Sequence, residues 1–285
     1  SAARAAALLA AREWRGVRRD VPLLALHYVP AVAVGLTLGL VFDDLDARNG
    51  TAAGIQDRLG LGFVICAAIG LSALSAPPRF RRAARLLARE RDSYGAVPAF
   101  FASAVVGDVL PLRLLPPALT AGLAMAFSRA ATTWSHGILF VLAAAQLHYA
   151  FAATGRFIGS VAPSDSVANA AASLLFLFNL LLCGFFVAPD DLSPAWRFLA
   201  RLLPASAGYE ALVIHEFADQ TELYLTSKVG STKYRSSPLT GEAVLRCFGF
   251  DVHRWFGDHI RLVLFSLAAD CAACIGMVVF AHERR

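Results

Sequence analysis

LLALHYVPAVAVGLTLGLVF, the stretch from Leu23 to Phe42, contains no Asp, Glu, Lys or Arg. A helix that rises ~1.5 Å per residue needs about 20 apolar residues to cross the ~30 Å hydrocarbon core of a bilayer. Three further stretches meet this criterion and two more nearly meet it: Leu59–Pro78, Gly137–Gly155 and Ser166–Pro189, then Val97–Ser128 and Leu262–Ala281. The sequence therefore predicts an all-α membrane protein.

The predicted protein has six transmembrane helices in a single membrane domain that covers residues 1–285. We expect the spans near residues 21–42, 59–78, 97–128, 135–157, 165–189 and 259–281. Only 16% of the residues are charged, against roughly 25% in soluble chains. A net charge of +5 would suggest nucleic acid in a soluble protein. Because cytoplasmic loops of membrane proteins collect arginine, we expect no nucleic-acid partner.

The distribution of arginines predicts the orientation of the helices. Residues 1–20 carry five arginines and residues 79–95 carry six, whereas the loop Asp43–Arg58 has two arginines against four aspartates. Short loops rich in Lys and Arg stay on the cytoplasmic side. We therefore expect an integral, multi-pass membrane protein with both termini in the cytoplasm.

Two of these basic segments also have helical patterns. Apolar residues from Ala10 to Val21 recur at helical spacing, which predicts an amphipathic helix on the membrane surface. A solvated helical lead-in explains the same pattern equally well. Between the second and third spans, Arg85 and Arg89 share one face of a predicted helix that could dock a partner. The alternative is that these arginines only satisfy the positive-inside rule.

Three charged residues fall inside predicted spans. Asp108 and Arg113 lie in the third span with Pro111 between them, and Asp270 lies in the sixth. A charge at bilayer depth costs at least ~2.5 kcal/mol on insertion scales, so each of these residues needs a partner. Five residues along an ideal helix separate two side chains by about 140°, so a direct pair requires a distortion at Pro111. We favour structural pairing over a role in binding substrate.

Residues 190–258 separate the fifth and sixth spans on the predicted outer side. Short amphipathic pieces around Trp196 and Leu212 suit a short helical re-entrant segment in the outer leaflet. The polar remainder, residues 218–258, suits an extracellular loop. Asn49 begins a glycosylation sequon in the first outer loop, close to the membrane.

The sequence lacks the motifs of an enzyme. It contains no GxxxxGK(S/T), the loop that wraps ATP phosphates with backbone N–H groups and a lysine. His215-Glu216 lacks the second histidine of HExxH. Cys271 and Cys274 have a CxxC spacing within an apolar run, where cysteine packs as a small hydrophobe. We expect no catalytic residue and no metal site on this chain.

Several motifs follow one another in a characteristic order. GIQDRLG (residues 54–60) enters the second span, and GDVLPLRLLP (107–116) lies in the third. YEAL (209–212) and HEF (215–217) follow the fifth span, and TGE (240–242), GFD (249–251) and Trp255 precede the last. In this order and spacing the chain resembles the transmembrane domain of an ABCG-subfamily half transporter, the White and breast cancer resistance protein group. The family usually has NEF where this chain has HEF.

The resemblance implies that ATP hydrolysis and transport are carried out by different domains. Residues 2–19 are similar to the connecting helix, and residues 81–94 to the coupling helix that would meet an ATP-binding domain through Arg85, Arg89, Glu90 and Tyr94. In this family the ATPase domain, which binds ATP and magnesium, precedes the membrane domain. We therefore expect a chain that starts at Ser1, without a cleavable leader, to be a piece of a longer polypeptide. Two halves, identical or different, would form the working dimer.

The resemblance also implies a substrate cavity on the two-fold axis, between the second and fifth spans. The matching positions are Val64, Ala67, Ala68 and Leu71, then Ser173, Phe176, Leu177 and Leu180, with Phe185 and Phe186 as an outer plug. Such residues would form a narrow apolar slot for lipid or sterol-like molecules; the alternative is that they only pack helix on helix. The groups that grip flat drugs in the multidrug member are replaced here, which argues against drug transport. Cys247 would form at most an intersubunit disulfide.

The function implied is the membrane half of an ATP-driven exporter of hydrophobic substrates, working as a dimer by alternating access. Its partners would be a second transmembrane half, an ATP-binding domain and the lipid bilayer. Rival interpretations are an ATPase-free permease or channel and a structural membrane subunit. A lipid-modifying enzyme would require His27, His148, Asp108 or Asp270 to converge on one site.

Overall fold

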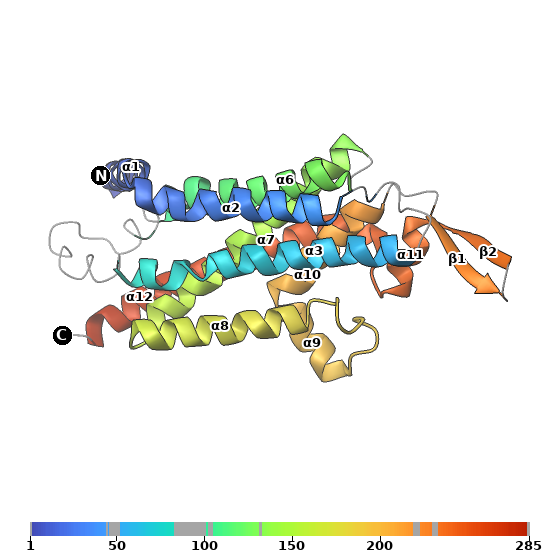
Figure 1. Ribbon diagram of the computed structural model, residues 1–285. Helices are drawn as coiled ribbons and strands as arrows, with labels where there is room; N and C mark the ends of the chain where they lie inside the picture. The colour runs from blue at the N-terminus through green and yellow to red at the C-terminus, as the bar shows by residue number, and fades with distance from the viewer. Residues whose placement is uncertain are drawn as a thin grey trace.

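The computed structural model describes residues 2–43, 45, 52–82, 101, 105–130, 133–218, 223–229 and 233–283. Long helices run alongside one another, with the two chain ends at one end of the bundle and a β-hairpin at the other (Figure 1). These two ends are called the terminal end and the hairpin end below.

Within the described residues, five helical segments are long and apolar enough to cross a membrane: Val21–Val41, Ala52–Arg82, Val105–Ser128, Trp134–Val161 and Val252–Val279. They coincide with or overlap the elements labelled in Figure 1 as α2 (Val21–Val41), α3 (Ala52–Ala73), α6 (Leu115–Ser128), α7 (Trp134–Val161) and α12 (Trp255–Glu283). A π-helix, η2 (Val109–Leu114), leads directly into α6. The predicted helical membrane architecture is confirmed.

The segment predicted as the fifth span is shorter than the others. Its helix, α8, covers Asp165–Leu181, and 17 residues reach about 26 Å at the usual rise, less than the ~30 Å core. The Ser164 side chain accepts a hydrogen bond from the Val167 N–H and caps its start. Beyond its end, Gly184 adopts a φ of 104°, a left-handed conformation that turns the chain and favours glycine. The described chain therefore has five full-length candidate spans and one short apolar helix, and the count of six stays a prediction.

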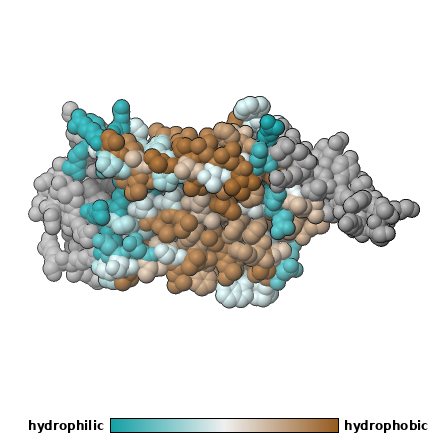
Figure 2. Space-filling view, viewed as in Figure 1, coloured by the Kyte–Doolittle hydropathy of each residue, from teal (hydrophilic) through white to brown (hydrophobic). Residues whose placement is uncertain are grey.

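The surface of the bundle carries a broad apolar band. Figure 2 shows hydrophobic residues across the middle of the molecule, with hydrophilic residues gathered toward its two ends. Leu26, Val29 and Leu40 of α2 are among its exposed side chains. Exposed apolar surface of this extent marks contact with lipid or with another protein. The chain is an integral membrane protein, and α1 (Ala2–Arg19) lies at the terminal end where the amphipathic helix is expected.

Small residues let α2 approach α6 closely. A Cβ added to Gly35 would lie 2.9 Å from the Thr120 carbonyl oxygen, and Gly39 meets Phe127 in the same way one turn on. The Thr120 hydroxyl donates a hydrogen bond to the Ala31 carbonyl across the interface, at 3.2 Å. Close backbone approach at small residues is the usual mode of helix association in membranes.

The hairpin end contains strands and short helices where the sequence predicted a loop, at residues 218–258. After α9 (Pro194–Leu202) and α10 (Pro204–Phe217), strand β1 (Leu223–Val229) pairs antiparallel with β2 (Lys233–Leu239), with Leu223 opposite Leu239. Helix α11 (Gly241–Cys247) and a 3-10 turn (Val252–Arg254) then lead into α12. A small two-stranded element therefore accompanies the helical domain.

Helix α10 packs inside the protein, whereas α9 lies at its surface. Almost all of the residues of α10 are buried within the protein, including the polar side chains of Glu210, His215 and Glu216. The Tyr209 hydroxyl donates to the Leu59 carbonyl at 3.1 Å, and the Asn179 amide oxygen accepts from the Ala205 N–H at 3.2 Å. Helix α10 thus joins α3 and α8, and only α9 presents an exposed apolar face.

Candidate functional site

The predicted cavity residues divide into an inner and an outer set. Phe176 of α8 is 6% exposed, and its ring lies so close to Gly70 of α3 that any added side chain there would overlap it. Phe151 of α7 meets the same ring edge to face at 5.6 Å between centroids. A space lined by Phe176 and its neighbours has a volume of about 20 Å³, too small for a substrate. Phe176 therefore packs the interior of this one chain.

Leu71 and Leu177, by contrast, lie on the surface. They are 58% and 60% exposed, and Leu174 and Leu181 on α8 are exposed as well. Val64, Ala67, Ala68, Ser173 and Leu180 are half-buried between the two sets. One chain therefore presents an apolar surface at these positions and does not enclose a slot.

The two predicted plug residues belong to an aromatic cluster at the hairpin end. Phe63 of α3 stacks on Phe185 at 4.4 Å and meets Phe186 edge to face at 5.0 Å. Tyr209 of α10 approaches Phe185 at 6.1 Å. Phe186 is exposed and Phe185 half-buried. Sequence reasoning missed Phe63, although it directly precedes the predicted cavity position Val64.

The intramembrane charges of the third span pair with each other. The Arg113 Nε donates to the Asp108 Oδ2 at 2.7 Å, and Arg79 Nε lies 3.2 Å from Asp108 Oδ1. The π-helix η2 contains Pro111 and widens the turn between the two residues, which an ideal α-helix would keep about 140° apart. Arg113 is fully buried and also donates to the Ser75 hydroxyl at 3.0 Å.

Asp270 of α12 is held by α7. Arg156 donates to its two carboxylate oxygens at 2.8 and 3.0 Å, a bidentate arrangement, and the Tyr149 hydroxyl donates at 2.6 Å. Arg156 Nη1 lies 3.9 Å from Asp108, which links this pair to the first. Sequence reasoning missed Arg156, which stands one residue beyond the charge-free stretch that ends at Gly155. The charged groups therefore hold four helical segments together: the second and third spans, α7 and α12.

This pattern of apolar helices, re-entrant helices and internal ion pairs agrees with a family comparison. The family model of the ABC-2 type transporter matches residues 4–217. The chain belongs to the ABC-2 type transporter family. The resemblance to the ABCG subfamily is confirmed by similar proteins of that subfamily.

Three relatives illustrate the range of similarity to this ABC-2 transporter chain. ABC transporter G family member 24 of Dictyostelium discoideum is 26% identical over 200 residues, which cover 70% of this chain and 17% of that protein. The broad substrate specificity ATP-binding cassette transporter ABCG2 of Bos taurus is 24% identical over 237 residues, covering 82% and 36%. ABC transporter G family member 8 of Arabidopsis thaliana is 24% identical over 263 residues, covering 91% and 44%. The chain spans less than half the length of each of these relatives.

The predicted coupling residues Arg85, Arg89, Glu90 and Tyr94 lie outside the described residues. The described stretch 52–82 of the ABC-2 transporter chain ends just before them, and Arg81 near its end is well anchored. Arg81 donates from Nε to the Asp165 carboxylate at 2.6 Å and from its terminal nitrogens to the Ala162 and Pro163 carbonyls. The terminal end of the second span is therefore fixed to the turn between α7 and α8. Asn49 also lies outside the described residues, whereas Cys247 is exposed as a free thiol.

Two of the sequence motifs of this transporter domain meet at a buried ion pair. Arg58, from the motif at residues 54–60, pairs with Glu216, from the motif at 215–217. Arg58 also donates to the Ala130 carbonyl at 2.7 Å and the Leu45 carbonyl at 3.2 Å. Its side chain is 0% exposed and that of Glu216 is 2% exposed. Sequence reasoning recognised both motifs without pairing them, because no spacing rule connects residues so far apart.

Three histidines form a chain beside this pair. His215 of α10 contacts His136 of α7 at 3.3 Å between Nδ1 atoms and His259 of α12 at 3.0 Å between Nε2 atoms. His259 in turn contacts the Gln146 amide oxygen. Burial, and then the neighbouring imidazoles of His259 and His136, lower the pKa of His215 to about 3. In the described part of the chain, no group of three His, Cys, Asp or Glu side chains is arranged to hold a metal ion.

Acidification from pH 7 to pH 5 should destabilise the domain by up to about 2 kcal/mol through His215, at about 1.4 kcal/mol per pKa unit. The unfolded histidine takes up a proton near its ordinary pKa of 6.5, while the folded one stays neutral down to a pKa of about 3. This contribution is complete above pH ~6.5 and is lost as the pH falls. Thermal unfolding in detergent at both pH values measures it. The His215→Asn variant carries the usual residue of the family motif and cannot titrate, so it should lose less stability between pH 7 and pH 5. An equal loss in both proteins would show that His215 is not the group responsible.

Proposed function

We propose that this chain is the membrane half of an ATP-driven exporter of hydrophobic, lipid or sterol-like substrates, and that it works as a dimer. The observation that carries the proposal is the match of residues 4–217 to the ABC-2 type transporter family. The ATPase activity would reside on a nucleotide-binding domain outside this chain, which would bind ATP and magnesium. Both termini would face the cytoplasm, because arginine is concentrated in the segments at the terminal end.

The proposed coupling to the ATPase uses the segment that follows the second span. Arg85, Arg89, Glu90 and Tyr94 would contact the nucleotide-binding domain, in keeping with the coupling helix of the family. Arg81, fixed to the turn between α7 and α8, would transmit movement of that segment to two further helices. Alternating access then requires that nucleotide and substrate bind the inward-open and outward-open states with different affinity.

The proposed substrate route runs along the dimer axis. The exposed apolar positions Leu71 and Leu177 would face their counterparts in the second half, so that two chains together enclose the slot. Phe176 would support this wall from behind because it packs on Gly70. Phe185 and Phe186, whose rings both contact Phe63, would close the route at the hairpin end. An apolar lining suits a hydrophobic cargo better than a charged one.

Substitution of Leu177 by Arg in the full-length transporter should abolish substrate-stimulated ATP hydrolysis, lowering the stimulation at least about tenfold. The control is Leu264→Arg on α12, because Leu264 is also 60% exposed and the substitution carries a similar insertion cost. The measurement is ATP hydrolysis in proteoliposomes with and without a fluorescent sterol. Equal stimulation in both variants would contradict the route. Sterol movement that needs no ATP would favour a permease or channel instead.

A further inference from the structure

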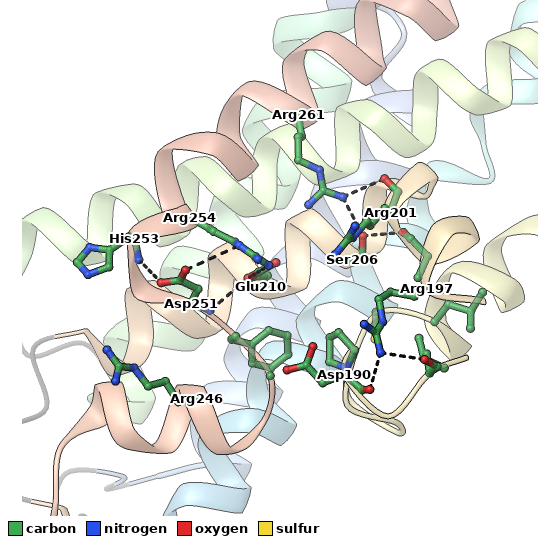
Figure 3. A pocket seen from close by; sticks show the side chains of 17 residues that line it. Asp190, Arg197, Arg201, Ser206, Glu210, Arg246, Asp251, His253, Arg254 and Arg261 are labelled. Atoms are coloured by element: carbon green, nitrogen blue, oxygen red, sulfur yellow. Dashed lines mark hydrogen bonds and ion pairs between the residues drawn. The ribbon is translucent and has the colours of Figure 1, made fainter. Parts of the chain in front are cut away.

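A second site lies at the hairpin end, away from the proposed route. A cavity of about 430 Å³ opens between α9, α10, α11 and the start of α12. Its lining includes five arginines, Arg197, Arg201, Arg246, Arg254 and Arg261, and three acidic residues, Asp190, Glu210 and Asp251. Figure 3 shows these side chains gathered around one space. A volume of this order is typical of small-molecule sites.

Three of the five arginines have carboxylate partners. Arg261 lies 2.9 Å from Asp258, and Arg246 lies 2.5 Å from Glu242. Arg254 lies 3.9 Å from both Glu210 and Asp251. These arginines are neutralised by the protein itself, and they give the cavity no free positive charge.

The two arginines of α9 are different. Arg197 donates only to the Asp190 and Leu192 backbone carbonyls, at 2.6 and 3.1 Å, and its Nε is buried without a hydrogen-bond partner. Arg201 makes no side-chain hydrogen bond or ion pair with the described residues. Four residues apart on one helix, the two guanidinium groups share a face. Together they offer two unpaired cationic groups to a phosphate, which arginine binds in a forked geometry.

One carboxylate in the cavity also has no ion-pair partner among the described residues. Asp190 lines the same cavity from the loop before α9, and its side chain makes no ion pair with the described part of the chain (Figure 3). The carboxylate stands beside the carbonyl that Arg197 holds. A ligand with both a phosphate and a positive group would therefore satisfy the cavity better than a simple anion.

The other face of α9 indicates where such a ligand comes from. Trp196, Phe198, Leu199 and Leu202 are all exposed on this helix. A short helix with an apolar outer face and arginines on its inner side lies in the interfacial region of a bilayer, at the depth of lipid headgroups. The cavity therefore opens next to the leaflet at the hairpin end, and a lipid headgroup reaches it more readily than a solute.

We propose that this cavity binds the headgroup of a zwitterionic phospholipid, with the phosphate between Arg197 and Arg201 and the ammonium group at Asp190. Binding here is separate from transport along the dimer axis and requires no nucleotide. The site would anchor α9, and with it the loop that carries the aromatic plug, to the surrounding leaflet.

The test is lipid binding to the full-length transporter, measured by native mass spectrometry without nucleotide. Phosphatidylethanolamine should bind the unmodified protein more tightly than phosphatidylglycerol, which lacks the ammonium group. Arg201→Gln should weaken phosphatidylethanolamine binding about tenfold, while Arg129→Gln, at the same end of the bundle, should leave it unchanged. Asp190→Asn should remove most of the preference between the two lipids.

Three results would overturn the proposal. Unchanged phosphatidylethanolamine binding by Arg201→Gln would remove the phosphate contact, and a preference for phosphatidylglycerol in the unmodified protein would remove the role of Asp190. Binding of soluble O-phosphoethanolamine as tightly as the lipid would make this a solute site. Because Arg201 is exposed and holds no loop, this variant should fold, and an unchanged thermal unfolding temperature checks that. ATP hydrolysis stimulated by sterol is measured separately, so failure here leaves the proposed export function standing.

Discussion

Replacement of Glu216 by Gln should lower the free energy of unfolding by about 3–5 kcal/mol, because it removes a carboxylate that contacts the buried Arg58 guanidinium directly. Neither side chain has access to water that could compensate. The two carbonyl oxygens that also accept from Arg58 supply partial charges only. We therefore expect poor expression or a large drop in unfolding temperature in detergent.

The matched control is Glu242→Gln. Glu242 pairs with Arg246 one helical turn away, but the two side chains are 47% and 71% exposed, and exposed pairs contribute about 0–1 kcal/mol. The same chemical change should therefore have little effect there. If both variants lost the same stability, the buried pair would not be the junction that we describe.

Asp270→Asn should be the second most damaging substitution, with a loss of about 3–5 kcal/mol. Arg156 would keep its charge inside the membrane domain, and the Tyr149 hydroxyl would lose its charged acceptor. The double variant Arg156→Gln/Asp270→Asn removes both charges and should recover much of that loss. A coupling energy of at least about 2 kcal/mol between the two positions is expected from a double-mutant cycle.

The recovery is the decisive measurement. Thermal unfolding of the two single variants and the double variant in the same detergent gives the cycle directly. Additive losses would show that Arg156 and Asp270 act independently, contrary to the bidentate contact. Asp191→Asn, at an exposed position of the hairpin end, serves as the control for loss of an acidic group.

Local pattern predicted the helices well, because apolar length alone decides whether a segment can lie in lipid. It also anticipated that Asp108 and Arg113 need a distortion at Pro111, since angular separation along a helix follows from spacing. The sequence did not reveal that the helix beginning at Asp165 ends at Leu181. The residues stay apolar as far as Pro189, beyond the turn at Gly184, so hydropathy alone extends the helix too far.

Contacts between distant segments could not be read from the sequence. Periodicity places Phe176 and Leu177 side by side, but only packing against Gly70 decides which one faces inward. The same holds for Arg156 and Asp270, whose pairing depends on how α7 lies against α12. The β-hairpin escaped notice because its strands, LYLTSKV and KYRSSPL, do not alternate regularly between apolar and polar residues.

The Arg58–Glu216 pair has a consequence for biosynthesis. Its partners are 158 residues apart, so the ribosome makes the second span long before it makes the glutamate. During that interval Arg58 lacks the carboxylate that it contacts in the folded domain, so the buried junction at the start of the second span is incomplete. The domain therefore completes its folding only when α10 has been synthesised and has packed against the second span. A nascent chain stopped before residue 216 would leave Arg58 without its Glu216 contact.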